Sequence, residues 1–114
     1  MLLLADQYHA HVYYDAEQVA FATELHRRAR QDLGELATIW PMRMTPVGPH
    51  YAPMFEIEFP HDSREPVLDW VQAHHGPLPV MLHPETGNVL DDHRDHAVWL
   101  GRNLGVNLAV LEAL

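Results

Sequence analysis

Close to its N-terminus the chain reads Tyr8-His9-Ala10-His11-Val12-Tyr13-Tyr14. The alternation, with its aromatic and β-branched residues, predicts a strand over residues 7–14. Because side chains alternate along a strand, the even-numbered residues should face one side and His9, His11 and Tyr13 the other. Imidazole is the commonest metal ligand. This face is therefore either a metal site or an open face with solvated polar residues.

The remaining segments complete a β-α-β-β-α-β order. Asp15 and Gln18 resemble a capping box, which predicts a helix from there to Gly34. Ser63 can cap a second helix that ends at Gly76. The predicted strands are 36–44, 54–59 and 78–83. This order is typical of the ferredoxin-like α+β sandwich. A C-terminal extension follows, with a short helix from Asp91 or Asp92 to Gly101 and then a short strand or helical turn over 106–110.

In this topology the first strand is central and pairs antiparallel with the third and fourth. The helices cover one face, so the expected core comprises Tyr8, Ala10, Val12, Phe55, Ile57 and Phe59. On the opposite face His83 should lie close to His9, and Glu56 close to His11. Directly opposed residues have Cβ atoms about 4.5–5.5 Å apart, which is close enough to share a metal ion.

Length and composition narrow the class of protein. The chain has 114 residues, which fits a single domain over 1–114. A net charge of −9 argues against nucleic-acid binding. We expect no membrane span, because no apolar run approaches the length that crosses a bilayer. We expect no signal peptide, because the apolar run Met1-Leu2-Leu3-Leu4 is short and lacks a basic start, and the absence of cysteine is compatible with a cytoplasmic location. There is also no lysine, which excludes Schiff-base catalysis.

Five motifs occur in the same order as in the DOPA 4,5-dioxygenase family, which this chain resembles over about residues 7–112. They are Tyr8-His9-Ala10-His11-Val12-Tyr13-Tyr14-Asp15, Gly48-Pro49-His50, Met54-Phe55-Glu56-Ile57, Leu82-His83-Pro84-Glu85-Thr86-Gly87 and Asp92-His93-Arg94-Asp95-His96-Ala97-Val98-Trp99-Leu100-Gly101. The resemblance is to a small bacterial-type member. It implies a ferredoxin-like fold and extradiol cleavage of a catechol, such as L-DOPA, with non-haem Fe(II) and O₂.

The predicted sheet face and this resemblance together suggest roles for individual residues. We expect His9, His11 and His83 to bind the metal, with Glu56 as a fourth ligand or a ligand-orienting carboxylate. His50 is the candidate acid or base, and the first replacement if one of the three histidines is not a ligand. The remaining catalytic candidates are His93 and His96, which would support the ligands, and Tyr13, which would contact the substrate ring. Zinc or nickel should be able to replace iron in purified protein.

The alternative function is a non-catalytic, dimeric αβ-barrel protein that binds a small molecule. The histidine face would then be an acidic ligand pocket or a subunit interface. Both hypotheses predict a homodimer, because Trp40, Met42, Met44 and Met54 would otherwise leave an apolar patch exposed.

Overall fold

The histidine-bearing strand lies at the centre of a five-stranded sheet with the order β2-β3-β1-β4-β5. The computed structural model describes residues 2–113, so Met1 and Leu114, the ends of the predicted domain, lie outside it. The elements are β1 (Gln7–Tyr13), η1 (Ala16–Gln18), α1 (Val19–Leu33), β2 (Thr38–Ile39), β3 (Met54–Pro60), η2 (His61–Ser63), α2 (Arg64–His74), β4 (Val80–Pro84), α3 (Val89–Asp92), β5 (Val98–Leu100) and α4 (Leu108–Glu112). Over residues 2–113, none of the helices is long and apolar enough to cross a bilayer.

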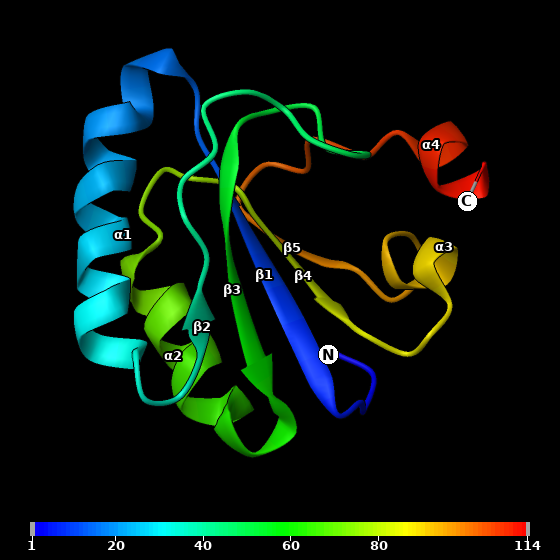
Figure 1. Cartoon of the computed structure of the whole chain (residues 1–114), viewed down its shortest axis with the longest axis horizontal. Coiled ribbons are helices and arrows are strands. Elements are labelled where there is room, and N and C mark those ends of the chain that lie inside the picture. The colour runs from blue at the N-terminus through cyan, green and yellow to red at the C-terminus, as the bar shows by residue number, and fades with distance from the viewer. Residues whose placement is uncertain (1, 114) are drawn as a thin grey trace.

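The layers are those of a ferredoxin-like α+β fold, which confirms the predicted class. The two long helices, α1 and α2, cover one face of the sheet, and the short α3 and α4 lie on the other side (Figure 1). β1 pairs antiparallel with both β3 and β4. The register places His9 opposite His83 and His11 opposite Glu56, as predicted.

The core lies between the sheet and the two long helices. Tyr8, Ala10, Val12 and the alternating apolar residues of β3 are all exposed by 1% or less. They pack against Ala22, Leu25 and Ala29 of α1 and against Val67 and Val71 of α2. Burying one face in this way fixes the register, because a slip of one residue would send His9 and His11 into the core.

Both ends of α1 follow local sequence signals. The Asp15 carboxylate accepts hydrogen bonds from the backbone amides of Glu17 and Gln18, and the Gln18 side chain accepts one from the Asp15 amide. This is the predicted capping box, although its first turn is a 3₁₀ turn. The helix ends before Gly34, where an added Cβ would lie 2.6 Å from the Arg30 carbonyl oxygen.

The predicted C-terminal helix is wrong in its extent. α3 covers only Val89–Asp92, and its cap is Asn88, whose side chain accepts from the Asp91 amide, rather than Asp91 or Asp92. Residues 98–100 form β5 on the free edge of β4. The edge of β4 would otherwise leave backbone groups unpaired, and the backbone of β5 pairs with them. Over 106–110 the helical alternative is correct for α4, while Val106 forms an isolated bridge with His50.

Two other boundaries differ from prediction. The strand expected over 36–44 is regular only at Thr38–Ile39. Pro41 has no amide hydrogen to continue a ladder, yet the Trp40 and Arg43 amides still donate to β3 carbonyls. Ser63 makes no side-chain cap: it ends a 3₁₀ turn, and α2 begins at Arg64.

Candidate metal centre

Three histidines converge on the sheet face opposite the long helices. His11 comes from β1, His83 from the adjacent β4, and His93 from the residue that follows α3. One donor atom from each of them lies within 4.8 Å of the other two. His11 and His83 are each only 5% exposed, and their Nε2 atoms are 2.9 Å apart.

Hydrogen bonds on the far side of the ring assign the tautomers of His83 and His93. The Nδ1 of His83 donates to the Pro84 carbonyl at 2.9 Å, and that of His93 donates to the Val89 carbonyl at 2.8 Å. The Nδ1 of His11 lies 3.4 Å from the Met54 sulfur. With Nδ1–H donating to a carbonyl, the Nε2 atoms of His83 and His93 keep their lone pairs. The Nε2 atoms of His11 and His83, 2.9 Å apart, can share one proton or face one cation, so this donor set fits a metal ion.

Burial keeps the rings of His11 and His83 neutral, which is the form that binds a metal. Burial and the neighbouring His93 lower the pKa of His83 to about 3. The pKa of His11 is also lowered well below its usual value, by burial and by the surrounding imidazoles. Removing a charged imidazolium from water is unfavourable, and like charges nearby add to that cost.

His50 and Tyr13 form a second pair beside the three histidines. The His50 ring centre lies 4.4 Å from that of His11, and its Nδ1 is 2.7 Å from the Tyr13 hydroxyl oxygen. Burial raises the pKa of Tyr13, so its hydroxyl stays protonated and can donate to Nδ1. Burial lowers the pKa of His50 to about 4. The ring is therefore neutral, and a Tyr13 hydroxyl that donates to Nδ1 leaves the ring proton on Nε2.

His9 lies among carboxylates instead. Its Nδ1 contacts a Glu56 oxygen, and its Nε2 is 3.1 Å from Glu85 and 3.8 Å from Glu58. Burial opposes the charged form of His9, but these carboxylates together raise its pKa to about 9. His9 stacks on His83 at 4.9 Å. The structure thus brings His9 and Glu56 together, beside the three converging nitrogens, with both His9 nitrogens already engaged.

The two histidines of the C-terminal motif separate. His93 joins the cluster, with its ring centre 4.2 Å from that of His83. The Nδ1 of His96 lies 3.4 Å from the Asp92 carboxylate, and the residue is partly exposed. Burial opposes the charged form of Asp92, but hydrogen bonds from Thr86 and His96 favour that form and lower the pKa of the Asp92 carboxyl. The predicted helix that ends at Gly101 would have carried both His93 and His96, but α3 ends before either residue.

Comparison with known proteins identifies the chain. The model of the Dopa 4,5-dioxygenase family matches residues 8–110, which includes every histidine of the cluster. The chain belongs to this family.

Two proteins of known sequence are similar to this member of the Dopa 4,5-dioxygenase family over most of its length. An uncharacterized 21.2 kDa protein of Botryotinia fuckeliana is 35% identical over 91% of this chain. A DOPA 4,5-dioxygenase of Amanita muscaria is 31% identical over 92% of it. The chain spans only 62% and 49% of the lengths of these relatives. A crystal structure of a candidate dioxygenase from Nostoc punctiforme superposes with a TM-score of 0.85 at 31% identity, covering 96% of this chain and 93% of that one.

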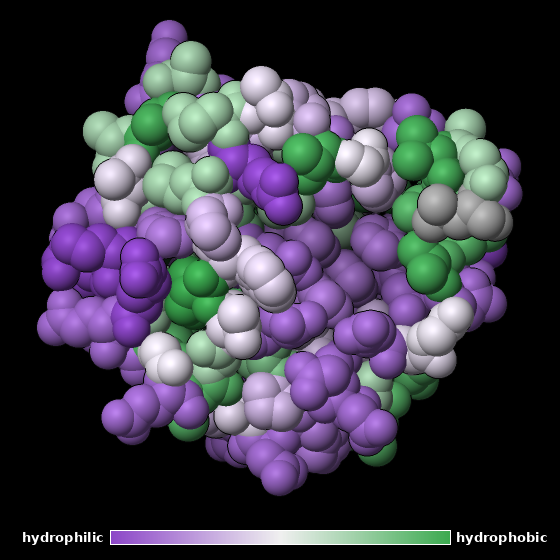
Figure 2. All heavy atoms as spheres, viewed as in Figure 1, coloured by the Kyte–Doolittle hydropathy of each residue, from purple (hydrophilic) through white to green (hydrophobic). Residues whose placement is uncertain are grey.

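Hollows border the centre of this Dopa 4,5-dioxygenase family member. Figure 2 shows hydrophilic residues lining a recess beside the apolar atoms over α4. One pocket of about 220 Å³ is lined by Trp40, Arg43, Met54 and Glu56, so it shares residues with the contacts of His11 and His9. Another, of about 320 Å³, has Tyr13 in its wall.

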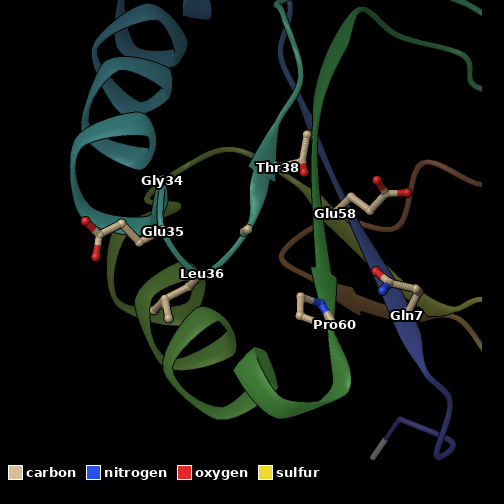
Figure 3. A pocket seen from close by; sticks show the side chains of 8 residues that line it. Gln7, Gly34, Glu35, Leu36, Thr38, Glu58 and Pro60 are labelled. Atoms are coloured by element: carbon tan, nitrogen blue, oxygen red, sulfur yellow. The ribbon is translucent and has the colours of Figure 1, made fainter.

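A third pocket lies at the other end of the sheet, beside the loop that precedes β2 and the end of β3. It has a volume of about 470 Å³ and includes Glu58 and Gln7. Figure 3 shows that the Glu58 side chain points away from Glu35 and Leu36, toward the side of β1. Glu58 therefore belongs with the carboxylates around His9, and this pocket lies apart from the three histidines.

Three residues of the centre were not singled out as site residues from the sequence. Met54 contacts His11, Glu85 contacts His9, and Asp92 holds His96. Met54 was assigned to a strand and to the apolar patch, whereas its side chain shares the face of His11. Glu85 and Asp92 lie on either side of an irregular turn, and hydrophobic periodicity does not predict the course of such a turn. The one available signal was that each lies within two residues of a motif histidine.

Proposed function

We propose that this protein is an extradiol ring-cleaving dioxygenase that opens a catechol, such as L-DOPA, with O₂ at a non-haem Fe(II) ion. The observation that carries the proposal is the convergence of three imidazole nitrogens, from His11, His83 and His93, on one sheet face in a member of this family. Neutral imidazoles suit iron as well as zinc and nickel, so either of the latter should be able to replace iron during purification.

His11, His83 and His93 would hold the ion, which leaves coordination positions open. Fe(II) would supply redox activity and positions for the catechol oxygens and O₂. The alternative set of His9, His11 and His83 with Glu56 requires His9 to leave Glu56 and Glu85. Because His9 carries a raised pKa in its present contacts, that exchange also costs a proton. We therefore favour His93 as the third ligand, with Glu56 holding His9.

His50 would act on the substrate. Its ring centre lies 4.4 Å from that of His11, and its Nδ1 contacts the Tyr13 hydroxyl, so its Nε2–H could donate a hydrogen bond to an oxygen of the substrate or of O₂ and later accept a proton. Tyr13 would keep His50 in this tautomer rather than contact the catechol directly. His96, which faces Asp92, would support the loop that carries His93.

The reaction consumes one O₂ for each catechol. Both oxygen atoms enter the product, and the ring carbon–carbon bond adjacent to the diol breaks, giving a yellow, conjugated semialdehyde acid. The test is anaerobic reconstitution with Fe(II), followed by addition of L-DOPA and O₂ while oxygen uptake and yellow absorbance are recorded together. Equal molar uptake and product formation would support the proposal. Binding of L-DOPA without oxygen uptake would favour the non-catalytic binding protein instead.

A matched control uses a histidine outside the cluster. His26 lies on α1, across the sheet, and its Nε2 donates to the Trp40 carbonyl. His26→Ala should keep iron and activity, whereas His83→Ala should lose both. Loss of both in the His26 variant would show that the assay reports general damage.

We also propose a homodimer in the cytoplasm. Trp40 and Met44 are 45% and 62% exposed, which leaves apolar surface beside the pocket at Glu56. A second copy of the chain would cover this surface.

A further inference from the structure

One carboxylate lies in the interior of the histidine side of the molecule. Asp92 is 3% exposed, and it is the only acidic residue among the buried residues of 2–113. A buried carboxylate is unfavourable unless hydrogen bonds replace its water. Asp92 accepts one from the Thr86 amide at 2.8 Å and one from the Thr86 hydroxyl at 2.5 Å. Its position is therefore strongly specified.

These bonds join two segments that carry site histidines. Thr86 follows Pro84, whose carbonyl fixes the His83 ring, and Asp92 directly precedes His93. The Thr86–Asp92 contact thus closes the turn between β4 and the end of α3. α3 has only four residues, and isolated helices of that length are unstable in water. The place of His93 consequently depends on contacts made from outside the helix.

We propose that Asp92 is a positioning residue: by clamping Thr86 to the end of α3, its carboxylate sets where His93 presents Nε2 toward His11 and His83. The inference rests on the proposed metal centre and adds a residue to it. Asp92 touches neither the metal nor the substrate in this role. It acts through the backbone, which joins it to His93, and through Thr86, which joins it to β4.

The test measures metal affinity in folded protein, by Co(II) and Zn(II) titration against a chromophoric chelator at a temperature far below unfolding. Asp92→Asn should weaken Co(II) and Zn(II) binding by about 10–100-fold, the usual loss when a residue that orients a ligand is removed. It should also change the visible Co(II) spectrum. Unchanged affinity with only a lower unfolding temperature would overturn the proposal, because Asp92 would then be a structural residue alone.

Thr86 provides a milder variant if Asp92→Asn does not fold. Thr86→Val keeps the shape of the exposed side chain and removes the hydroxyl, which donates to Asp92 and accepts from the Asn88 amide at 3.4 Å, so it should weaken metal binding in the same direction. Thr86→Ser restores the donor and should bind within about twofold of the wild type. Equal affinities for the Val and Ser variants would contradict the clamp.

A double-mutant cycle separates this inference from the proposed ligand set. In the His93→Ala background, Asp92→Asn should have little further effect on metal affinity, because its route to the metal is gone. A full additional loss would show that Asp92 does not act through His93. If His93→Ala alone left the affinity unchanged, the ligand set itself would be wrong, and the clamp would fail with it for that distinct reason.

Discussion

The Nε2 atoms of His11 and His83 lie 2.9 Å apart, and each ring has its Nδ1 engaged elsewhere. The two strands hold these nitrogens at a distance that one proton or one bound cation can bridge. A cation bound here would contact two strands of the folded chain, and the unfolded chain has no such site. Metal binding and stability should consequently be linked in this protein.

Metal removal is the direct test of that linkage. At a free metal concentration 100 times Kd, binding to the folded state alone stabilises it by about 2.7 kcal/mol. We expect Zn(II) or Fe(II) to raise the unfolding temperature by several degrees and a chelator to reverse the shift. Differential scanning calorimetry measures it. The control, His83→Ala, should unfold at the same temperature with and without metal.

Ligand substitution should distinguish the two proposed ligand sets. His93→Ala should lose most bound metal, because one of three converging nitrogens is removed. His9→Ala should retain metal, because His9 contacts Glu56 and Glu85 in this structure. Metal content by mass spectrometry after dialysis reports both. The opposite pattern, with metal lost only in the His9 variant, would establish the set of His9, His11, His83 and Glu56.

Adjacent residues of β1 should have opposite effects. His11→Ala should abolish ring cleavage with little loss of stability, because its side chain lies on the sheet face opposite the main core. Val12→Ala should keep metal and activity but lower the free energy of unfolding by about 1–3 kcal/mol, through lost apolar burial and a small cavity. Urea unfolding and oxygen uptake measure the two effects. Full activity and full metal content in His11→Ala would refute the site.

His50 should affect turnover without affecting metal content. If it transfers protons or donates to an oxygen, His50→Ala should lower kcat by about 10²–10⁴-fold. Tyr13→Phe removes the hydroxyl bound to Nδ1 and should give a smaller loss of kcat. Steady-state kinetics on the iron-loaded variants measures both. Loss of iron from the His50 variant would instead make His50 a ligand.

The homodimer is tested in solution. Light scattering at micromolar concentration should give twice the chain mass of 13.1 kDa. Trp40→Glu places a charge in the exposed apolar surface and should shift the protein toward monomer. A wild-type protein that is monomeric at this concentration would rule the dimer out.

The sequence was sufficient for the parts of the fold that periodicity describes. Alternation in β1 and β3 predicted both faces, and Asp15 with Gln18 predicted the start of α1. It was insufficient where tertiary contacts override local preference. Asp91 and Asp92, as candidate caps, favoured a helix as far as Gly101. Residues 98–100 instead pair as a strand with the free edge of β4. His93 then falls at a helix end rather than on a helix face, which is why its place in the cluster was not predicted.

Because of the edge strand β5, the backbone that carries His11 and His83 is held more firmly than the backbone that carries His93. It pairs with β4, which already pairs with β1, so the strands of His11 and His83 are both interior strands of the sheet. His93 stands on a four-residue helix in a long connection. Regions with few backbone pairings open at lower free energy than interior strands. Amide hydrogens of β1 and β4 should therefore exchange slowly and those around His93 quickly, so that an ion first meets two fixed nitrogens and is then enclosed by the third.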